Sequence, residues 1–293
     1  MNPALLGVIA ALSWGTHDFA ARFPSRDIGP RHAVFGVTLS GLVWLSLWLA
    51  TTGATPILHW PTLWLPALTG ISFAFATIWL FAALTAGPIA VVAPIVGAYP
   101  TYAVAFAFIL GSRPSATDWA AMAAVVLGVI LVARQGENQG ETAPADVSPQ
   151  GAARARALGY AFAAGLGFAC SLTAGQYAAP HYGEIEGTWL ARIFGLAAVT
   201  LLCLTGPDGG AARLGRYGRW WILLAVMGLL DSLALTAVIA AGHQPNAEIA
   251  TVTSSAFGAV TVILARVFLK EAVTPAQWTG IALIFAGVGV LSA

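Results

Sequence analysis

The sequence predicts an all-α integral membrane protein in which ten transmembrane helices form two inverted five-helix repeats around a central cavity. Apolar residues make up 58% of the 293 residues and charged residues only 9%, against about 25% charged residues in soluble domains. Ten apolar stretches approach the roughly 20 residues that a helix needs to cross a bilayer. A polar segment separates these stretches into five and five, and the two groups end in similar sequences.

Each predicted span is a continuous apolar run, which indicates a helix and not the alternating pattern of a barrel strand. The first run follows an N-terminus without Lys or Arg, so we expect it to be retained and not cleaved as a signal peptide. In chain order the predicted spans are residues 3–21, 32–52, 64–86, 88–111, 117–133, 157–179, 187–206, 219–241, 246–268 and 275–292.

The fourth span is the least regular of the first half. The segment AGPIA, residues 86–90, leaves room only for a tight turn before it. Pro88, Pro94 and Pro100 fall at its start or within it, and each proline removes a helical hydrogen bond. Carbonyl groups freed in this way are tolerated at membrane depth only where they face protein or a cavity. We therefore expect this span to be bent and mobile.

Residues 134–156 are rich in Gly, Gln, Glu, Ala and Pro, which is the composition of a linker. We expect a first five-helix repeat over residues 1–133, this polar linker, and a second five-helix repeat over residues 157–293. The closing spans of the two halves correspond, because LGSRPSATDWAAMAAVVLGVILVA resembles LKEAVTPAQWTGIALIFAGVGVLSA. A repeat with an odd number of spans places its second copy in the inverted orientation, as in secondary transporters whose site lies at mid-membrane.

Loop charges predict the orientation, since cytoplasmic loops carry an excess of Lys and Arg. Two basic residues, Arg113 and Arg192, belong to one face, and the other eleven belong to the opposite face. We expect the second face and the linker to be cytosolic and both chain ends to lie outside the cytosol. The eleven residues are Arg22, Arg26, Arg31, Arg134, Arg154, Arg156, Arg213, Arg216, Arg219, Arg266 and Lys270.

Several classes of protein are excluded by what the sequence lacks. It has no basic stripe or nucleic-acid-binding motif, so we expect no nucleic-acid partner. Cys170 and Cys203 fall in apolar runs, where free cysteines pack as small hydrophobic side chains. The five histidines are scattered without metal-ligand spacing, and no Walker motif is present. We therefore expect no metal, no cofactor, no ATP-driven step and no enzymatic activity.

The stretch ALSWGTHDFAARF, residues 11–23, resembles the opening of the ten-helix, EamA-type carriers of the drug/metabolite transporter superfamily. Those carriers begin with a short apolar run, then Trp-Gly and a small polar residue. In the same family the fourth helix of each repeat often carries Pro and ends on Glu. These places hold Pro100 and Arg113 in the first half and Gly258 and Glu271 in the second, so two of the four positions depart from the pattern.

Within that superfamily the sequence resembles the bacterial exporters of aromatic amino acids. The resemblance implies a multi-pass secondary transporter of the bacterial inner membrane; the loop charges then place both termini in the periplasm. It implies export of amino acids, aromatic or otherwise apolar ones, by alternating access through one central path. The expected partners are this small-molecule substrate and the lipid bilayer, and we expect a monomer. The alternative is an exporter of another neutral metabolite or drug, with a membrane enzyme as a third hypothesis.

Candidate residues for the substrate path begin with polar groups at membrane depth, which must face protein or water. Trp14, His17, Asp18 and Arg22 are three or four residues apart and therefore share one face of the first span. Asp18 and Arg22 also have the spacing of a helical ion pair. This face either lines the inner mouth of the path or caps and anchors the cytosolic end of the helix.

The second half supplies further candidates. Asp231 lies near the middle of the eighth span, where a carboxylate costs about 2.5–3.5 kcal/mol. It therefore needs a partner, a cavity or a proton, and it is either a proton site or a residue that fixes helix packing. Thr251, Ser254 and Ser255 give the ninth span a polar face, which either lines the path or allows close helix packing.

Aromatic side chains away from the span ends complete the set, because an aromatic cavity with a few polar groups suits an apolar or aromatic molecule. Phe75 and Trp79 share a face of the third span, and Tyr99 and Tyr102 share a face of the fourth. For each of these side chains ordinary packing is the competing interpretation. The remaining candidates lie towards the outer face of the membrane: Gln176, Tyr177 and Trp189.

Overall fold

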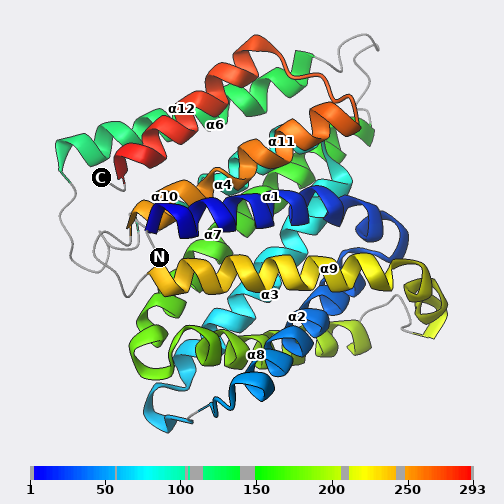
Figure 1. Cartoon of the computed structure of the whole chain (residues 1–293). Helices are drawn as coiled ribbons and strands as arrows, with labels where there is room; N and C mark the ends of the chain where they lie inside the picture. Colours follow the sequence, from blue (N-terminus) through cyan, green and yellow to red (C-terminus); the bar gives the residue numbers. More distant parts are fainter. Residues whose placement is uncertain are drawn as a thin grey trace.

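The computed structural model describes residues 3–56, 58–102, 105, 115–138, 149–205, 211–241 and 248–291, and every regular element in these ranges is helical. The helices form one elongated bundle in which the start of α1 and the end of α12 lie at the same end (Figure 1). The elements are α1 (Pro3–Ile28), α2 (Pro30–Thr52), η1 (Trp60–Thr62), α3 (Trp64–Ala86), α4 (Ile89–Gly97), α6 (Ala116–Asn138), α7 (Pro149–Tyr182), α8 (Glu184–Thr205), α9 (Ala211–Ala241), α10 (Glu248–Ser255), α11 (Phe257–Phe268) and α12 (Pro275–Leu291).

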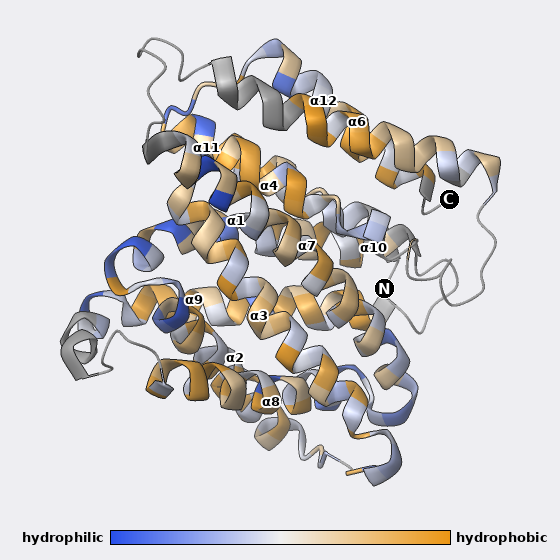
Figure 2. Ribbon diagram, turned by 180° about the vertical axis from the view of Figure 1, so that it is seen from behind, coloured by the Kyte–Doolittle hydropathy of each residue, from blue (hydrophilic) through white to orange (hydrophobic). Residues whose placement is uncertain are grey.

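The described helices have the length and composition of membrane spans. Five of them are long and apolar enough to cross a bilayer: Pro30–Thr52, Trp60–Ala86, Gly151–Tyr182, Glu184–Thr205 and Tyr217–Ala240. Shorter apolar helices accompany them, and Figure 2 shows mainly apolar colours along the helices, with hydrophilic segments at their ends. The all-helical, membrane-type fold predicted from the sequence is therefore confirmed.

Helices extend into both ends of the predicted linker, residues 134–156. The helix α6 continues to Asn138, and α7 begins at Pro149, eight residues before the expected start of the sixth span. The residues between these helices lie outside the described part of the chain. The division of the chain into two repeats and a linker therefore stays a prediction.

Two of the predicted spans are interrupted near their middle. The helix α4 contains Pro94 and ends at Gly97, and helical conformation resumes at residues 99–102, so the expected bend of the fourth span is confirmed. The predicted ninth span is likewise divided into α10 and α11 at Ala256, which the sequence analysis did not anticipate. The interruptions adjoin, since a Cβ on Gly97 would lie 3.5 Å from the Ser255 carbonyl oxygen. Two broken helices thus meet inside the bundle.

The pairing of helices mixes the two halves of the chain. The helix α1 packs against α9, α10 and α11, whereas α3 packs against α7 and α8. The helix α2 lies between α8 and α9, and α4 packs against α11 and α7. The helices α6 and α12 pack mainly against each other, at one edge of the bundle (Figure 1). The interior is therefore bounded by helices from both halves, with α1, α3, α7 and α9 at its centre.

Glycines let the central helices approach closely. A Cβ on Gly70 of α3 would lie 1.8 Å from the carbonyl oxygen of Ala191 of α8, and one on Gly195 would lie 2.8 Å from the Gly70 carbonyl oxygen. A Cβ on Gly228 of α9 would lie 2.6 Å from the backbone nitrogen of Gly41 of α2. Small residues at such crossings allow backbone contact between membrane helices. These contacts fix the positions of α3 and α9, which carry part of the site described next.

Candidate functional site

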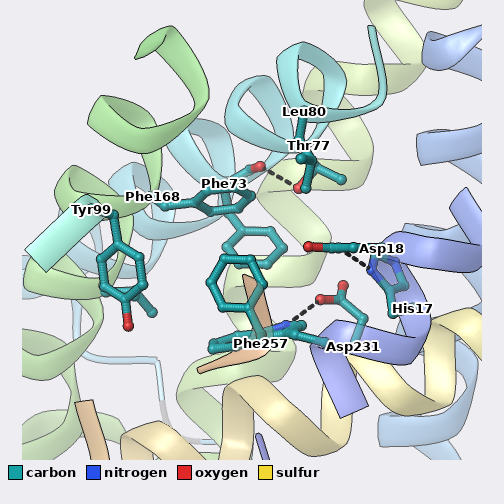
Figure 3. Close-up of a pocket in the computed structure, with 11 residues that line it drawn as sticks. His17, Asp18, Phe73, Thr77, Leu80, Tyr99, Phe168, Asp231 and Phe257 are labelled. Carbon is teal, nitrogen blue, oxygen red and sulfur yellow. Dashed lines mark hydrogen bonds and ion pairs between the residues drawn. The ribbon is translucent and has the colours of Figure 1, made fainter. Parts of the chain in front are cut away.

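A small cavity of about 30 Å³ lies between the two halves of the chain. Its walls come from α1, α3, α7, α9 and α11, together with Tyr99 just beyond α4. Figure 3 shows the polar side chains on one side of it and aromatic rings across from them. The lining residues are Trp14, His17, Asp18, Phe73, Thr77, Leu80, Tyr99, Phe168, Leu172, Asp231 and Phe257.

Three residues of α1 contribute to the polar wall. Trp14, His17 and Asp18 are all buried, as expected from their shared helical face. The Nδ1 atom of His17 lies 2.9 Å from Oδ1 of Asp18, so these sequence neighbours interact in spite of their different directions on the helix. The indole N–H of Trp14 donates a hydrogen bond of 3.0 Å to Oδ1 of Asp231 on α9. The first half of the chain thus contacts the second half through a polar bond inside the bundle.

Asp231 also has a charged partner. Its Oδ2 lies 2.7 Å from Nη2 of Arg192 on α8, and both side chains are almost fully buried. The Arg192 guanidinium lies over the ring of Phe73, 5.1 Å from its centroid. The structure thus gives Asp231 the partner that a carboxylate at this depth requires. Arg192 is therefore an interior residue and does not contribute charge to the outer face, with which the sequence analysis counted it.

The opposite wall of the cavity is aromatic. Phe73 and Phe168 contact edge to face with ring centroids 5.2 Å apart, and Trp14 and Phe257 do so at 6.2 Å. Such edge-to-face pairs hold their rings in fixed orientations. The hydroxyl of Tyr99 lies 3.2 Å from the hydroxyl of Ser254, which joins the two broken helices. The aromatic wall is therefore held by contacts between α1, α3, α7 and α11 and by the interruption itself.

Towards one end of the bundle, an ion pair joins the two halves. Arg22 of α1 donates a short hydrogen bond to Oε1 of Glu271, which follows α11. The other carboxylate oxygen, Oε2, accepts a bond of 3.2 Å from the backbone N–H of Ala90 at the start of α4. The expected Asp18–Arg22 pair is therefore wrong: Asp18 contacts its neighbour His17 on the same helix, whereas helix packing brings Glu271 to Arg22.

Several predicted path residues lie away from this cavity. Phe75 and Trp79 are half-buried and pack on each other with centroids 5.9 Å apart. The ring of Tyr102 lies against Gly165 of α7. Gln176 and Tyr177 are exposed on α7, the latter by 64%, and Trp189 donates a hydrogen bond to Ser46.

The predicted polar face of the ninth span is placed only in part. Ser254 and Ser255 are buried, and Ser254 reaches the cavity only through Tyr99. The side chain of Thr251 lies outside the described part of the structure. Neither Ser254 nor Ser255 lines the cavity. Ser254 instead forms a hydrogen bond between two helical segments, with Tyr99 as its partner.

Sequence reasoning missed Phe73, Thr77 and Leu80 on α3, Phe168 and Leu172 on α7, and Phe257 on α11. The α3 residues have i, i+4, i+7 spacing, one face of a helix, but the aromatic pair chosen from the sequence lies on another face. Thr77 was the available signal, because a hydroxyl within an apolar span indicates the face that is turned towards protein.

The arrangement favours binding over covalent chemistry. Among the described residues, no group of three or more His, Cys, Asp or Glu side chains could hold a metal ion. The polar groups line a concave aromatic site at the junction of the two halves, which is the kind of place where transporters bind their substrate.

Comparison with known proteins agrees with this geometry. One solved structure, described only as the crystal structure of a protein, has a TM-score of 0.63 and 19% identity, covering 98% of this chain and 97% of its own; this likeness concerns the fold. No curated relative matches the sequence. Residues 1–134 and 155–293 match the EamA-like transporter family, whose members are multi-pass membrane transporters of small metabolites. The chain therefore belongs to the EamA-like transporter family of the drug/metabolite transporter superfamily.

Proposed function

We propose that the protein is a secondary transporter of the bacterial inner membrane that exports amino acids, aromatic or other apolar ones, by alternating access. The observation that carries this proposal is the cavity between the halves, where aromatic rings face the buried Asp18 and Asp231 (Figure 3). Aromatic walls with a few fixed polar groups suit a small molecule that has an apolar body and a polar end.

Transport by alternating access requires two halves that can rock about the site, and the pairing of helices supports such halves. If residues 157–293 repeat residues 1–133, then α7 corresponds to α1 and α9 to α3. The pairing of α1 with α9 then matches the pairing of α7 with α3, and α2 with α9 matches α8 with α3. This exchange of roles is what a two-fold axis between inverted repeats would produce.

The closing helices support the same relation. A Cβ on Gly128 of α6 would lie 2.6 Å from the carbonyl oxygen of Gly280 on α12. A Cβ on Gly287 of α12 would lie 2.8 Å from the carbonyl oxygen of Ala121 on α6. The later residue of α6 contacts the earlier residue of α12, so the two helices are antiparallel. Reciprocal contacts of this kind are typical of a two-fold relation between two copies.

The direct test is transport by the purified protein in liposomes. Radiolabelled tryptophan or phenylalanine should enter liposomes that are loaded with the same unlabelled amino acid, at a rate above that of protein-free liposomes. Asp231→Asn should reduce this exchange, whereas Glu186→Gln, at the start of α8 and outside the cavity, should not. Failure of every amino acid to exchange would reject the amino acid substrate.

A pH gradient across the same liposomes separates two mechanisms. A proton-coupled carrier moves substrate against its gradient when protons flow the other way, whereas a facilitator only equilibrates it. Exchange unaffected by the gradient would remove the proposed proton role of Asp231.

The alternative substrate class, another neutral metabolite or drug, is tested in the same assay by competition. A compound of this class that blocks exchange of labelled phenylalanine at a lower concentration than phenylalanine itself would favour it.

The orientation, with both termini in the periplasm, needs its own measurement. A C-terminal alkaline phosphatase fusion should be active, because this enzyme matures only outside the cytosol. An inactive fusion, with a cytosolic reporter active at the same position, would reverse the orientation.

A further inference from the structure

We infer that the cavity recognises its substrate as an organic cation, an aromatic amine held through its ammonium group, and that it offers no positive charge to a substrate carboxylate. This inference rests on the proposed function, because it takes the cavity as the substrate site. It goes further by stating which end of an amino acid-like molecule the site binds.

The positive charge nearest the cavity is already neutralised. Arg192 is not among the residues that line the cavity. Its guanidinium is held between the carboxylate of Asp231 and the ring of Phe73. The Asp231 oxygens are both engaged, one by Arg192 and the other by Trp14. The Arg192–Asp231 pair is therefore neutral as a unit.

The remaining polar pair presents hydrogen-bond acceptors. An ionised carboxylate only accepts hydrogen bonds, so in the His17–Asp18 contact the hydrogen is assigned to Nδ1 of His17. In the neutral ring the Nε2 atom of His17 then carries a lone pair, and it is buried without a hydrogen-bond partner. Figure 3 shows an oxygen of Asp18 directed away from His17 towards the aromatic rings. A carboxylate oxygen in this position favours a ligand that carries N–H donors and positive charge.

The formal charge leads to the same conclusion. With Arg192 and Asp231 cancelling each other, neutral His17 and ionised Asp18 together leave the lining with one net negative charge. A buried negative charge requires a counterion or a proton. A protonated amine bound at Asp18 supplies the counterion, and a second carboxylate would add to the unbalanced charge.

The aromatic wall strengthens the preference for a cation. Rings of Trp14, Phe73, Tyr99, Phe168 and Phe257 line the same cavity as Asp18. The faces of such rings attract ammonium groups, and cages of aromatic side chains are used to bind organic cations. The same rings pack against the aromatic part of an arylalkylamine. Asp18 and the aromatic wall therefore fit the two ends of one molecule.

The test compares ligands that differ in one charged group on the wild-type protein. Binding of radiolabelled 2-phenylethylamine to purified protein in detergent is competed with phenylalanine amide, phenylalanine and 3-phenylpropionate. Phenylalanine amide should compete well, and phenylalanine should bind at least about tenfold more weakly, the scale of one charge-assisted hydrogen bond. The carboxylate without an amine should not compete. This series needs no variant, so it does not depend on a mutant being folded.

Variants then locate the ammonium site. Asp18→Asn should weaken binding of 2-phenylethylamine at least about tenfold. The matched control is Asp27→Asn on the same helix. The Asp27 carboxylate accepts a hydrogen bond from Trp220 and lies outside the cavity, so this variant should bind 2-phenylethylamine as wild type does. If Asp18→Asn binds the amine as well as wild type does, the inference is wrong.

The outcomes separate this inference from the proposed function. Equal binding of phenylalanine and 2-phenylethylamine, with Arg192→Met selectively weakening phenylalanine, would overturn the inference and leave amino acid export standing. Binding of amines together with no exchange of any amino acid would support the inference and reject the amino acid substrate. Absence of binding by every ligand in the series would reject both.

Discussion

The buried Arg192–Asp231 pair gives a stability prediction whose size follows from its surroundings. The two side chains are only 4% and 2% exposed, and the charged atoms lie 2.7 Å apart. Removal of one member of such a pair leaves a buried charge without its partner, which costs about 3–5 kcal/mol. A surface pair would cost about 0–1 kcal/mol. Arg192→Met and Asp231→Asn should therefore each lower the free energy of unfolding by about 3–5 kcal/mol.

A double-mutant cycle distinguishes the pair from two independent residues. The double mutant, Arg192→Met with Asp231→Asn, leaves no unpaired buried charge. It should therefore lower the free energy of unfolding by less than the sum of the two single changes. We expect an interaction energy near 3 kcal/mol, the upper end for residues in contact. Reversible unfolding in detergent micelles, followed by circular dichroism at increasing denaturant, measures all four proteins.

The less buried Arg22–Glu271 pair serves as the comparison in the same assay. Its side chains are 13% and 16% exposed, so solvent screens it and we expect an interaction energy of about 1 kcal/mol. Additive single changes at Arg192 and Asp231, within about 0.5 kcal/mol, would refute the reasoning. An interaction energy larger at Arg22–Glu271 than at Arg192–Asp231 would refute it as well.

Three further predictions concern other contacts. Trp14→Phe keeps the ring but removes the N–H that bonds Asp231, and should lower the free energy of unfolding by about 1–3 kcal/mol. Gly128→Ala pushes α6 away from α12 and should lower the free energy of unfolding by about 1–3 kcal/mol. The control Gly159→Ala, with no heavy atom within 4 Å of the new Cβ, should raise it by about 0.5–1 kcal/mol. Equal effects of the two changes in the same unfolding assay would contradict the close packing of α6 and α12. Glu271→Gln should loosen the ion pair that joins the two halves towards one end of the bundle, so that a cysteine placed at Thr77 reacts faster with a water-soluble maleimide added from that side; an unchanged rate would show that the pair does not control access.

The polar residues of the site were the most predictable from sequence. Trp14, His17 and Asp18 share a helical face, and Asp231 interrupts an apolar helix. Polar and ionisable groups at membrane depth avoid lipid, so their direction follows from chemistry alone. The structure places all four on the wall of one cavity.

The aromatic residues were predicted far less well. Tyr99 lines the cavity, whereas Phe75, Trp79 and Tyr102 do not. In a water-soluble protein the polar face of a helix is turned to solvent, so the opposite, apolar face is identified as the buried face. In a membrane helix both the lipid side and the protein side are apolar, so an aromatic side chain carries no such signal. Phe73 and Phe168 could therefore be found only once the helices were placed.

The pattern and composition of the chain determined that it is a helical membrane protein, because bilayer thickness and the cost of unpaired backbone groups leave helices as the structure for continuous apolar runs. They also determined which polar residues turn inward. The tertiary structure decided the partners: Arg192 with Asp231, Arg22 with Glu271, and Tyr99 with Ser254. These pairs join residues from 39 to 249 positions apart in the sequence. Spacing along one helix fixes only neighbours three and four residues away, so contacts between distant segments depend on how whole helices pack.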